Sequence, residues 1–176
     1  MTDNKDGGIP PQAIDSEKLI LGSILIDPNI LERIYWGYFP PSAFFKTSHK
    51  TIFNEMVEIA KSEGTVNFLL LQQALEGKGI LEAIGGVDSL IDIANSGLTC
   101  EDVEEHVCVV MESYRKRTAI KIAGNLLHDS MSNEISIDEA FDTVITSIDE
   151  LQFLSSDFFT FVEIYEKNSG RINENE

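Results

Sequence analysis

The sequence of 176 residues has no apolar run that approaches the ~20 residues needed to cross a bilayer. Its first residues, Met1 to Gly8, are polar and acidic and lack the apolar segment of a signal peptide. The two cysteines, Cys100 and Cys108, would lie ~12 Å apart along a straight helix, which is too far for a disulfide within it. These absences predict a cytoplasmic protein with no membrane contact and with reduced thiols.

Motifs for catalysis or cofactor binding are also lacking. None of the three histidines pairs with another His or Cys at a metal-ligand spacing, and His49 is expected to be a packed or surface residue. The Gly77-Lys78 pair is not part of a nucleotide-binding P-loop, because Gln72 stands where its first glycine belongs. No catalytic residue, cofactor or metal is therefore expected. An enzyme with an unrecognised site stays as an alternative, which detectable ATPase activity would support.

Basic side chains are few, since 13 Lys and Arg stand against 30 Asp and Glu and give a net charge of −17. Residues 101–176 hold most of this charge, with 6 basic and 17 acidic side chains. A surface this acidic repels phosphate backbones, so direct nucleic-acid binding is not expected. The charge serves solubility or, alternatively, attracts a protein partner with a basic face.

Hydrophobic periodicity predicts an all-α fold, because no stretch alternates apolar and polar residues long enough for a strand. The helix with the run Leu19–Ile26 is apolar nearly all round and is expected at the centre of the core. Gly22 within that helix suggests that another helix passes close to it. Asn67 is expected to cap the helix that follows it, and Thr47 or Ser48 the preceding helix.

Four segments are predicted along the chain. A compact N-terminal helical domain precedes a long helical hairpin, with less structured residues on either side. The segments are a flexible leader at 1–13, a compact helical domain at 14–98, a helical hairpin at 99–154, and a linker-like tail at 155–176, either ordered or disordered.

The hairpin is predicted to turn near Asn133, and its second helix opens with the capping-box spacing of Ser136 and Glu139. Large apolar residues then recur every 4 and 3 positions, which is typical of a coiled-coil seam. These seam residues are Ile137, Phe141, Val144, Ile148 and Leu151. The corresponding series on the first helix is Val103, Val107, Val110, Tyr114, Ile120, Ala123 and Leu127.

Further apolar residues fall outside this seam and need another body to cover them. They are Ala119, Ile122, Leu126, Ala140, Ile145 and Phe153. Either the N-terminal half of the chain or a second copy is expected to cover them.

The first hairpin helix also carries a basic cluster, made of Arg115, Lys116, Arg117 and Lys121. With a turn near Asn133, Arg117 would lie across from Asp149, so ion pairs between the two hairpin helices are expected to tune their register. The alternative is a solvated basic patch on an acidic protein.

Three stretches resemble, in the correct order, the N-terminal part of bacterial replicative DNA helicases of the DnaB type. The first runs from Pro10 to Asp27, with PPQAIDSE leading into LGSILID. The second is FFKTSHKTIF at residues 44–53, similar to the family's DFY…H..IF run, and the third is LEAIGGVDSL at residues 81–90, similar to its L…GG..YL stretch. The resemblance extends over about residues 10–154.

This resemblance implies a compact helical domain and a hairpin that pairs between subunits, giving a homodimer or a trimer of dimers that forms a collar on the hexameric motor. It also implies docking of the primase C-terminal domain or of a helicase loader in the primosome. On this basis five residues of the second helix are expected to hold the hairpin together and to form its contact with a second copy. They are Ile137, Phe141, Val144, Ile148 and Leu151. The residues expected to dock a partner are Leu127, Met131 and Ile135, at or near the hairpin tip.

The family's motor domain with its P-loop has no counterpart in the sequence, so ATP hydrolysis and DNA unwinding do not carry over. The run FFTFVEIY at residues 158–165 resembles the start of the linker to that motor. The chain is therefore either a piece of a longer helicase or a stand-alone collar domain. The alternative outside the family is an acidic helical adaptor or regulator that is unrelated to DNA unwinding.

Overall fold

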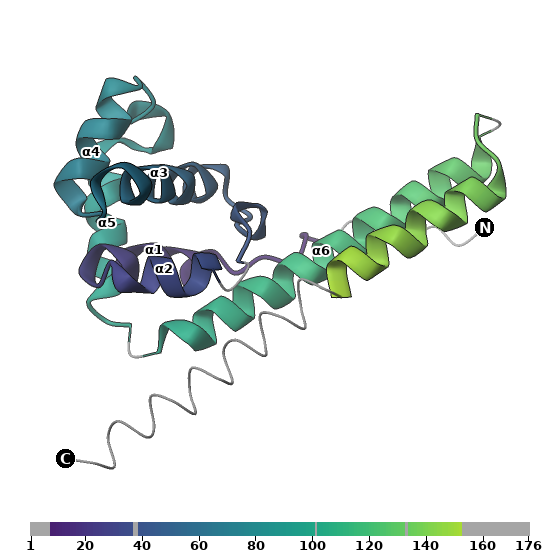
Figure 1. Ribbon diagram of the computed structural model, residues 1–176, viewed down its shortest axis with the longest axis horizontal. Coiled ribbons are helices and arrows are strands. Elements are labelled where there is room, and N and C mark those ends of the chain that lie inside the picture. Colours follow the sequence, from purple (N-terminus) through teal and green to yellow (C-terminus); the bar gives the residue numbers. More distant parts are fainter. Residues whose placement is uncertain (1–7, 37–38, 101, 133, 153–176) are drawn as a thin grey trace, which may run out of the picture.

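The computed structural model describes residues 8–36, 39–100, 102–132 and 134–152, and these are helices and connecting loops without a β-strand. The predicted all-α fold, a compact helical domain followed by a long hairpin, is thereby confirmed (Figure 1). The elements are α1 (Ile14–Ile26), α2 (Asn29–Trp36), η1 (Pro41–Ala43), α3 (Thr47–Glu63), α4 (Phe68–Gly77), η2 (Glu82–Ile84), α5 (Gly86–Gly97) and α6 (Val103–Met131). Residues 137–152 form a further helix. The tail at 155–176 and the first seven residues of the leader lie outside the described residues.

The core of the compact domain forms around α1, as its apolar sequence predicts. Ile20, Leu21 and Ile24 are fully buried, because α3, α5 and α6 all pack against this helix. Beside them, the rings of Phe39, Phe44 and Phe53 form a cluster with centroids 5.1 to 5.8 Å apart. Aromatic rings at this spacing add stabilisation beyond their buried area, so the loop before α3 is held firmly against the domain.

Helices α1 and α5 cross in close contact at Gly22 and Gly97, which confirms that another helix passes close to Gly22. A Cβ atom on Gly22 would overlap the backbone oxygen of Ile93 and the backbone of Gly97. A Cβ atom on Gly97 would overlap the backbone of Gly22. The Ser96 hydroxyl also donates a hydrogen bond of 3.0 Å to the carbonyl of Lys18 at this crossing. Only glycine at both positions allows the two backbones to approach this closely.

We expect Gly22→Ala to lower the free energy of unfolding by about 1–3 kcal/mol, because the added methyl group must push α1 and α5 apart. This decrease is the net effect, after the ~1 kcal/mol that alanine gains over glycine in helix propensity. Gly124 in α6 provides the matched control, since nothing lies within 4 Å of the Cβ it would gain. Gly124→Ala should stabilise the protein by up to ~1 kcal/mol in urea unfolding. Equal effects of the two substitutions would contradict the close crossing.

Of two helix caps predicted from the sequence for the compact domain, one is confirmed and the other is wrong. The side chain of Asn67 accepts a hydrogen bond of 3.0 Å from the amide of Leu70, which confirms it as the cap of α4. The prediction that Thr47 or Ser48 caps α3 is wrong. The cap position of α3 is Lys46, whose side chain makes no capping bond. The carboxylate of Glu17 on α1 supplies that function instead, as described below.

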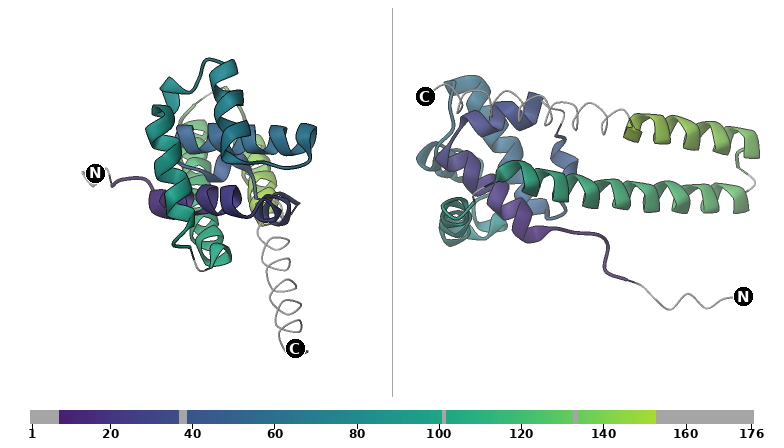
Figure 2. Two further views of the ribbon diagram at one scale, coloured as in Figure 1. Left: turned by 90° about the vertical axis from the view of Figure 1, so that its left-hand side faces the viewer. Right: turned by 90° about the horizontal axis from the view of Figure 1, so that it is seen from below.

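The hairpin leaves the compact domain as a long arm (Figures 1 and 2). Its first helix, α6, has 29 residues, of which Val103, Val107, Val110 and Met111 are buried in the domain core. The remainder of α6 runs alongside the helix at 137–152 (Figure 2). The capping box that starts this second helix is confirmed, because Ser136 N donates to Glu139 Oε2 at 2.9 Å and Glu139 N donates to Ser136 Oγ at 3.2 Å.

Candidate interaction site

The two hairpin helices meet along small, polar and mid-sized side chains. On the second helix the buried position is Ala140, which is 1% exposed, and Val144, Ser147 and Leu151 are half-buried. A cavity of about 200 Å³ lies between the helices, lined by Ile122 and Asn125 of α6 and by Ser147 and Leu151, among others. The inner face of the hairpin is therefore built on the series Ala140, Val144, Ser147 and Leu151.

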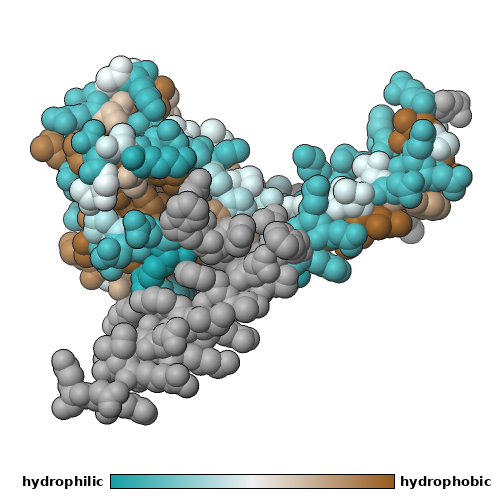
Figure 3. All heavy atoms as spheres, in the orientation of Figure 1, coloured by the Kyte–Doolittle hydropathy of each residue, from teal (hydrophilic) through white to brown (hydrophobic). Residues whose placement is uncertain are grey.

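The large apolar residues of the hairpin lie mostly outside this inner face, so the predicted single seam is wrong in part. On the second helix Ile137, Phe141, Ile145 and Ile148 form an exposed series that we call the outer stripe. Phe141 is 49% exposed and Ile145 is 57% exposed. On α6, Ile120 and Leu127 are also exposed, whereas Ile122 and Leu126 are half-buried. Apolar surface along the arm is visible in Figure 3.

The difference lies in which residues of the second helix face α6. Ala140 is buried, and the half-buried Ser147 lines the cavity between the two helices, so a small and a polar residue occupy positions that an apolar pattern does not mark. The predicted set of five residues therefore divides between two faces. Val144 and Leu151 lie toward α6, while Ile137, Phe141 and Ile148 face outward. Residues spaced by 3 and 4 lie on one face of a helix, whereas adjacent residues point in different directions. Val144 therefore belongs to the inner face and Ile145 to the outer stripe.

The tip of the arm exposes the three residues predicted to dock a partner. Leu127 is 64% exposed, Met131 is 79% exposed, and Ile135 in the turn is 40% exposed. Asn133, where the turn was predicted, lies outside the described residues, but the chain between Ser132 and Ser136 connects the two helices. Turns on a protein surface are usually polar, so three exposed apolar side chains at the tip of the arm indicate an interaction surface.

The basic cluster of α6 makes different contacts from the predicted ones. Arg115 and Lys116 lie 3.6 and 3.4 Å from Glu112 on the same helix. The Arg117 side chain extends to the compact domain, where it donates hydrogen bonds to the carbonyls of Pro11 at 2.8 Å and Ala43 at 2.5 Å. The predicted pairing of Arg117 with Asp149 across the hairpin is therefore wrong, because two backbone carbonyls of the domain bind its guanidinium.

Arg117 lies in a joint between the arm and the compact domain. Its guanidinium carbon is 5.4 Å from the centre of the Phe45 ring and 5.9 Å from that of Tyr114, which are cation–π distances. Burial lowers the pKa of Arg117, while the nearby carboxylate of Glu17 and the Tyr114 side chain act in the opposite direction. Because an arginine stays protonated even after such a decrease, this side chain brings a permanent cation to the base of the arm.

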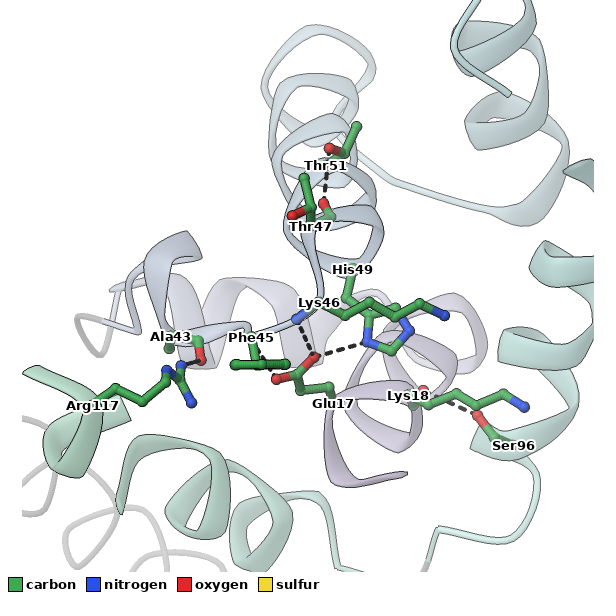
Figure 4. A network of polar contacts seen from close by, with 10 residues as sticks. All are labelled: Glu17, Lys18, Ala43, Phe45, Lys46, Thr47, His49, Thr51, Ser96 and Arg117. Carbon is green, nitrogen blue, oxygen red and sulfur yellow. Dashed lines mark hydrogen bonds and ion pairs between the residues drawn. The ribbon is translucent and has the colours of Figure 1, made fainter. Parts of the chain in front are cut away.

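Glu17 is the other charged residue of the joint and is fully buried on α1. Its Oε1 accepts a hydrogen bond of 2.5 Å from the amide of Phe45, and its Oε2 accepts one of 3.3 Å from the amide of Lys46 (Figure 4). His49 Nδ1 lies 2.9 Å from the same Oε2 and donates to it. A carboxylate at the start of a helix is favoured by the helix dipole, so Glu17 caps α3 from another element.

The joint was missed in the sequence for a physical reason. Glu17 and Phe45 are 28 positions apart, and Arg117 and Ala43 are 74 positions apart. No local pattern connects residues at such separations. His49 is buried and paired with Glu17, in agreement with the prediction of a packed or surface histidine. Within the described residues, no group of three or more His, Cys, Asp or Glu is arranged to hold a metal, and no helix is long and apolar enough to cross a membrane.

Comparison with known proteins identifies the family. The model of the DnaB-like helicase N terminal domain matches residues 9–112, which is more than half of the chain. The chain belongs to the DnaB-like helicase N-terminal domain family. The resemblance found in the three sequence stretches is thereby confirmed.

Full-length relatives of this DnaB-like domain are replicative helicases. The replicative DNA helicase DnaB of Geobacillus stearothermophilus is 30% identical over 143 residues, which are 81% of this chain and 31% of that protein. The replicative DNA helicase DnaC of Bacillus subtilis (strain 168) is 28% identical over 151 residues, which are 86% of this chain and 33% of that protein. The chain thus spans about a third of the length of these curated relatives.

A solved structure has the same fold as this DnaB-like domain. The crystal structure of the N-terminal domain of DnaB helicase from Mycobacterium tuberculosis superposes with a TM-score of 0.71 at 17% sequence identity. The match covers 81% of this chain and 99% of that chain. The arrangement of a compact domain with a hairpin arm is therefore shared with a domain of replicative helicases.

Proposed function

We propose that this chain is a non-catalytic oligomerisation and docking domain of a replicative DNA helicase. The outer stripe of the hairpin carries this proposal. Four large apolar side chains, 40 to 57% exposed, follow one another on the side of the second helix that does not face α6. Covering the exposed half of such a side chain is worth about 1 kcal/mol, so a second hairpin placed on the stripe would gain several kcal/mol from both copies together.

The outer stripe supports pairing between hairpins because it lies on an arm free of the compact domain. A second copy can approach the arm along its length without displacing the core of either subunit (Figure 2). A symmetric pair places the same stripe on both sides of the contact, so each apolar residue is used twice. A homodimer, or three such dimers in a collar, is the assembly that follows.

The tip of the arm is the proposed docking site for the primase C-terminal domain or a helicase loader. Leu127 and Met131 lie one helical turn apart at the end of α6, Ile135 follows in the connection to the second helix, and all three are exposed. Methionine adapts its shape to different partners and is common on surfaces that bind proteins. Pairing along the arm leaves the tip accessible.

The test is the solution mass by light scattering on a sizing column, over a range of concentrations, followed by addition of the cognate primase C-terminal domain. The expected result is twice the mass of 19.6 kDa, or a multiple of it, and a further increase with the primase domain. Met131→Asp should remove the second step and leave the first. A monomer at every concentration would contradict pairing. A dimer that binds neither the primase domain nor, in a parallel run, the helicase loader would favour the adaptor alternative.

A further inference from the structure

A groove on the compact domain remains outside the proposed function. It lies between α3 and α4, has a volume of about 520 Å³, and is on the part of the domain away from the hairpin arm (Figure 1). Its apolar floor is formed by Ile59, Leu70 and Ala74. The other lining residues are polar or charged. The groove thus combines a few apolar side chains with charged ones, as a site for an amphipathic segment does.

The rim of this groove is acidic. Glu55, Glu58 and Glu63 of α3 line it, against a single lysine, Lys78, which follows α4. Glu58 also lies 3.0 Å from Lys61 on the same helix, and both side chains are more than half exposed. Glu58 and Glu63 are exposed, so their carboxylates are within reach of a cation that arrives from solvent, whereas Glu55 is buried.

Lys78 shows how a cation binds in the groove. Its Nζ lies 2.6 Å from Glu55 Oε2, and the Glu55 side chain is only 9% exposed. The ammonium group of Lys78 therefore reaches a largely buried carboxylate in a groove that apolar side chains also line. A lysine or arginine of a partner would use the same combination at Glu58 and Glu63.

We propose that the groove between α3 and α4 docks a basic amphipathic helix of a partner protein. Apolar side chains of that helix contact Ile59, Leu70 and Ala74, and its lysines or arginines pair with Glu58 and Glu63. The occupant is inferred to be basic because the exposed carboxylates of Glu58 and Glu63 line the groove and favour opposite charge. The complementary charge of a basic partner attracts it to the groove and fixes its orientation.

In the experiment, an unlabelled amphipathic peptide of leucine and lysine is titrated into the isotope-labelled 176-residue chain. The changes in amide NMR chemical shift then map where the peptide binds. Shifts are expected to concentrate at residues 55–78. The double variant Glu58→Gln with Glu63→Gln should weaken the peptide about fivefold, since exposed ion pairs contribute modestly. The matched control, Glu134→Gln with Asp149→Asn on the hairpin, removes the same charge and should change the affinity less than about twofold.

Two results would overturn the proposal. Equal weakening by the two double variants, or shifts spread over every acidic face, would show attraction by net charge alone. A change in the solution mass of the groove variant would show that a second copy occupies the groove. The Phe141→Asp variant should keep its peptide affinity, so failure of hairpin pairing and failure of the groove are separate outcomes.

Discussion

Phe141→Asp is expected to weaken self-association by about 100-fold or more, with the helical content unchanged. Phe141 is the largest side chain of the outer stripe and is half exposed in the single chain. Pairing would bury the exposed part of this ring in both copies, whereas an aspartate there would bury two unpaired charges. Sedimentation equilibrium gives the dissociation constant, and far-UV circular dichroism reports whether the fold survives.

The control for this substitution is Ile91→Asp. Ile91 is 44% exposed, but it lies on α5 in the compact domain. The two variants gain the same charge at positions of similar exposure, so a general effect of acidity would appear in both. Association that is unchanged in Phe141→Asp, or equally weakened in both, would remove the outer stripe from the interface.

The distribution of residues on the hairpin explains why an apolar pattern alone did not separate the two faces. The spacing of 4 and 3 from Ile137 to Leu151 identified a helix and an apolar side correctly. It could not identify which part of that side faces α6, because Ala140 and Ser147 carry little hydrophobic signal. The large residues Ile137, Phe141, Ile145 and Ile148 stay exposed beside that inner face and are available for a second contact.

The prediction succeeded where the cause is local and failed where it is distant. The capping box of Ser136 and Glu139, the cap at Asn67 and the close approach at Gly22 depend on residues that are near in sequence or on one exceptional residue. The Glu17 carboxylate and the Arg117 guanidinium act on backbone groups of the loop before α3, which only the tertiary fold brings to them. The sequence contains 30 Asp and Glu, and nothing local distinguishes Glu17, which is fully buried.

Glu17→Ala should be the most destabilising of the substitutions considered, with a loss of about 3–5 kcal/mol in urea unfolding. The substitution leaves the amides of Phe45 and Lys46 and the ring of His49 without the acceptor they share. It also removes the carboxylate close to Arg117, so the domain and the base of the arm lose a common anchor.

Glu17→Gln separates the charge from the volume of the side chain at Glu17. Glutamine keeps the size but turns one acceptor into a donor, so an N–H group would face another donor, at a cost of about 1–3 kcal/mol. Asp149→Asn, at an exposed carboxylate on the hairpin, serves as the control and should stay within about 0.5 kcal/mol of the unchanged protein. If Glu17→Gln were as stable as that control, the buried carboxylate would not cap α3. The joint would then depend on the cation–π and carbonyl contacts of Arg117 alone.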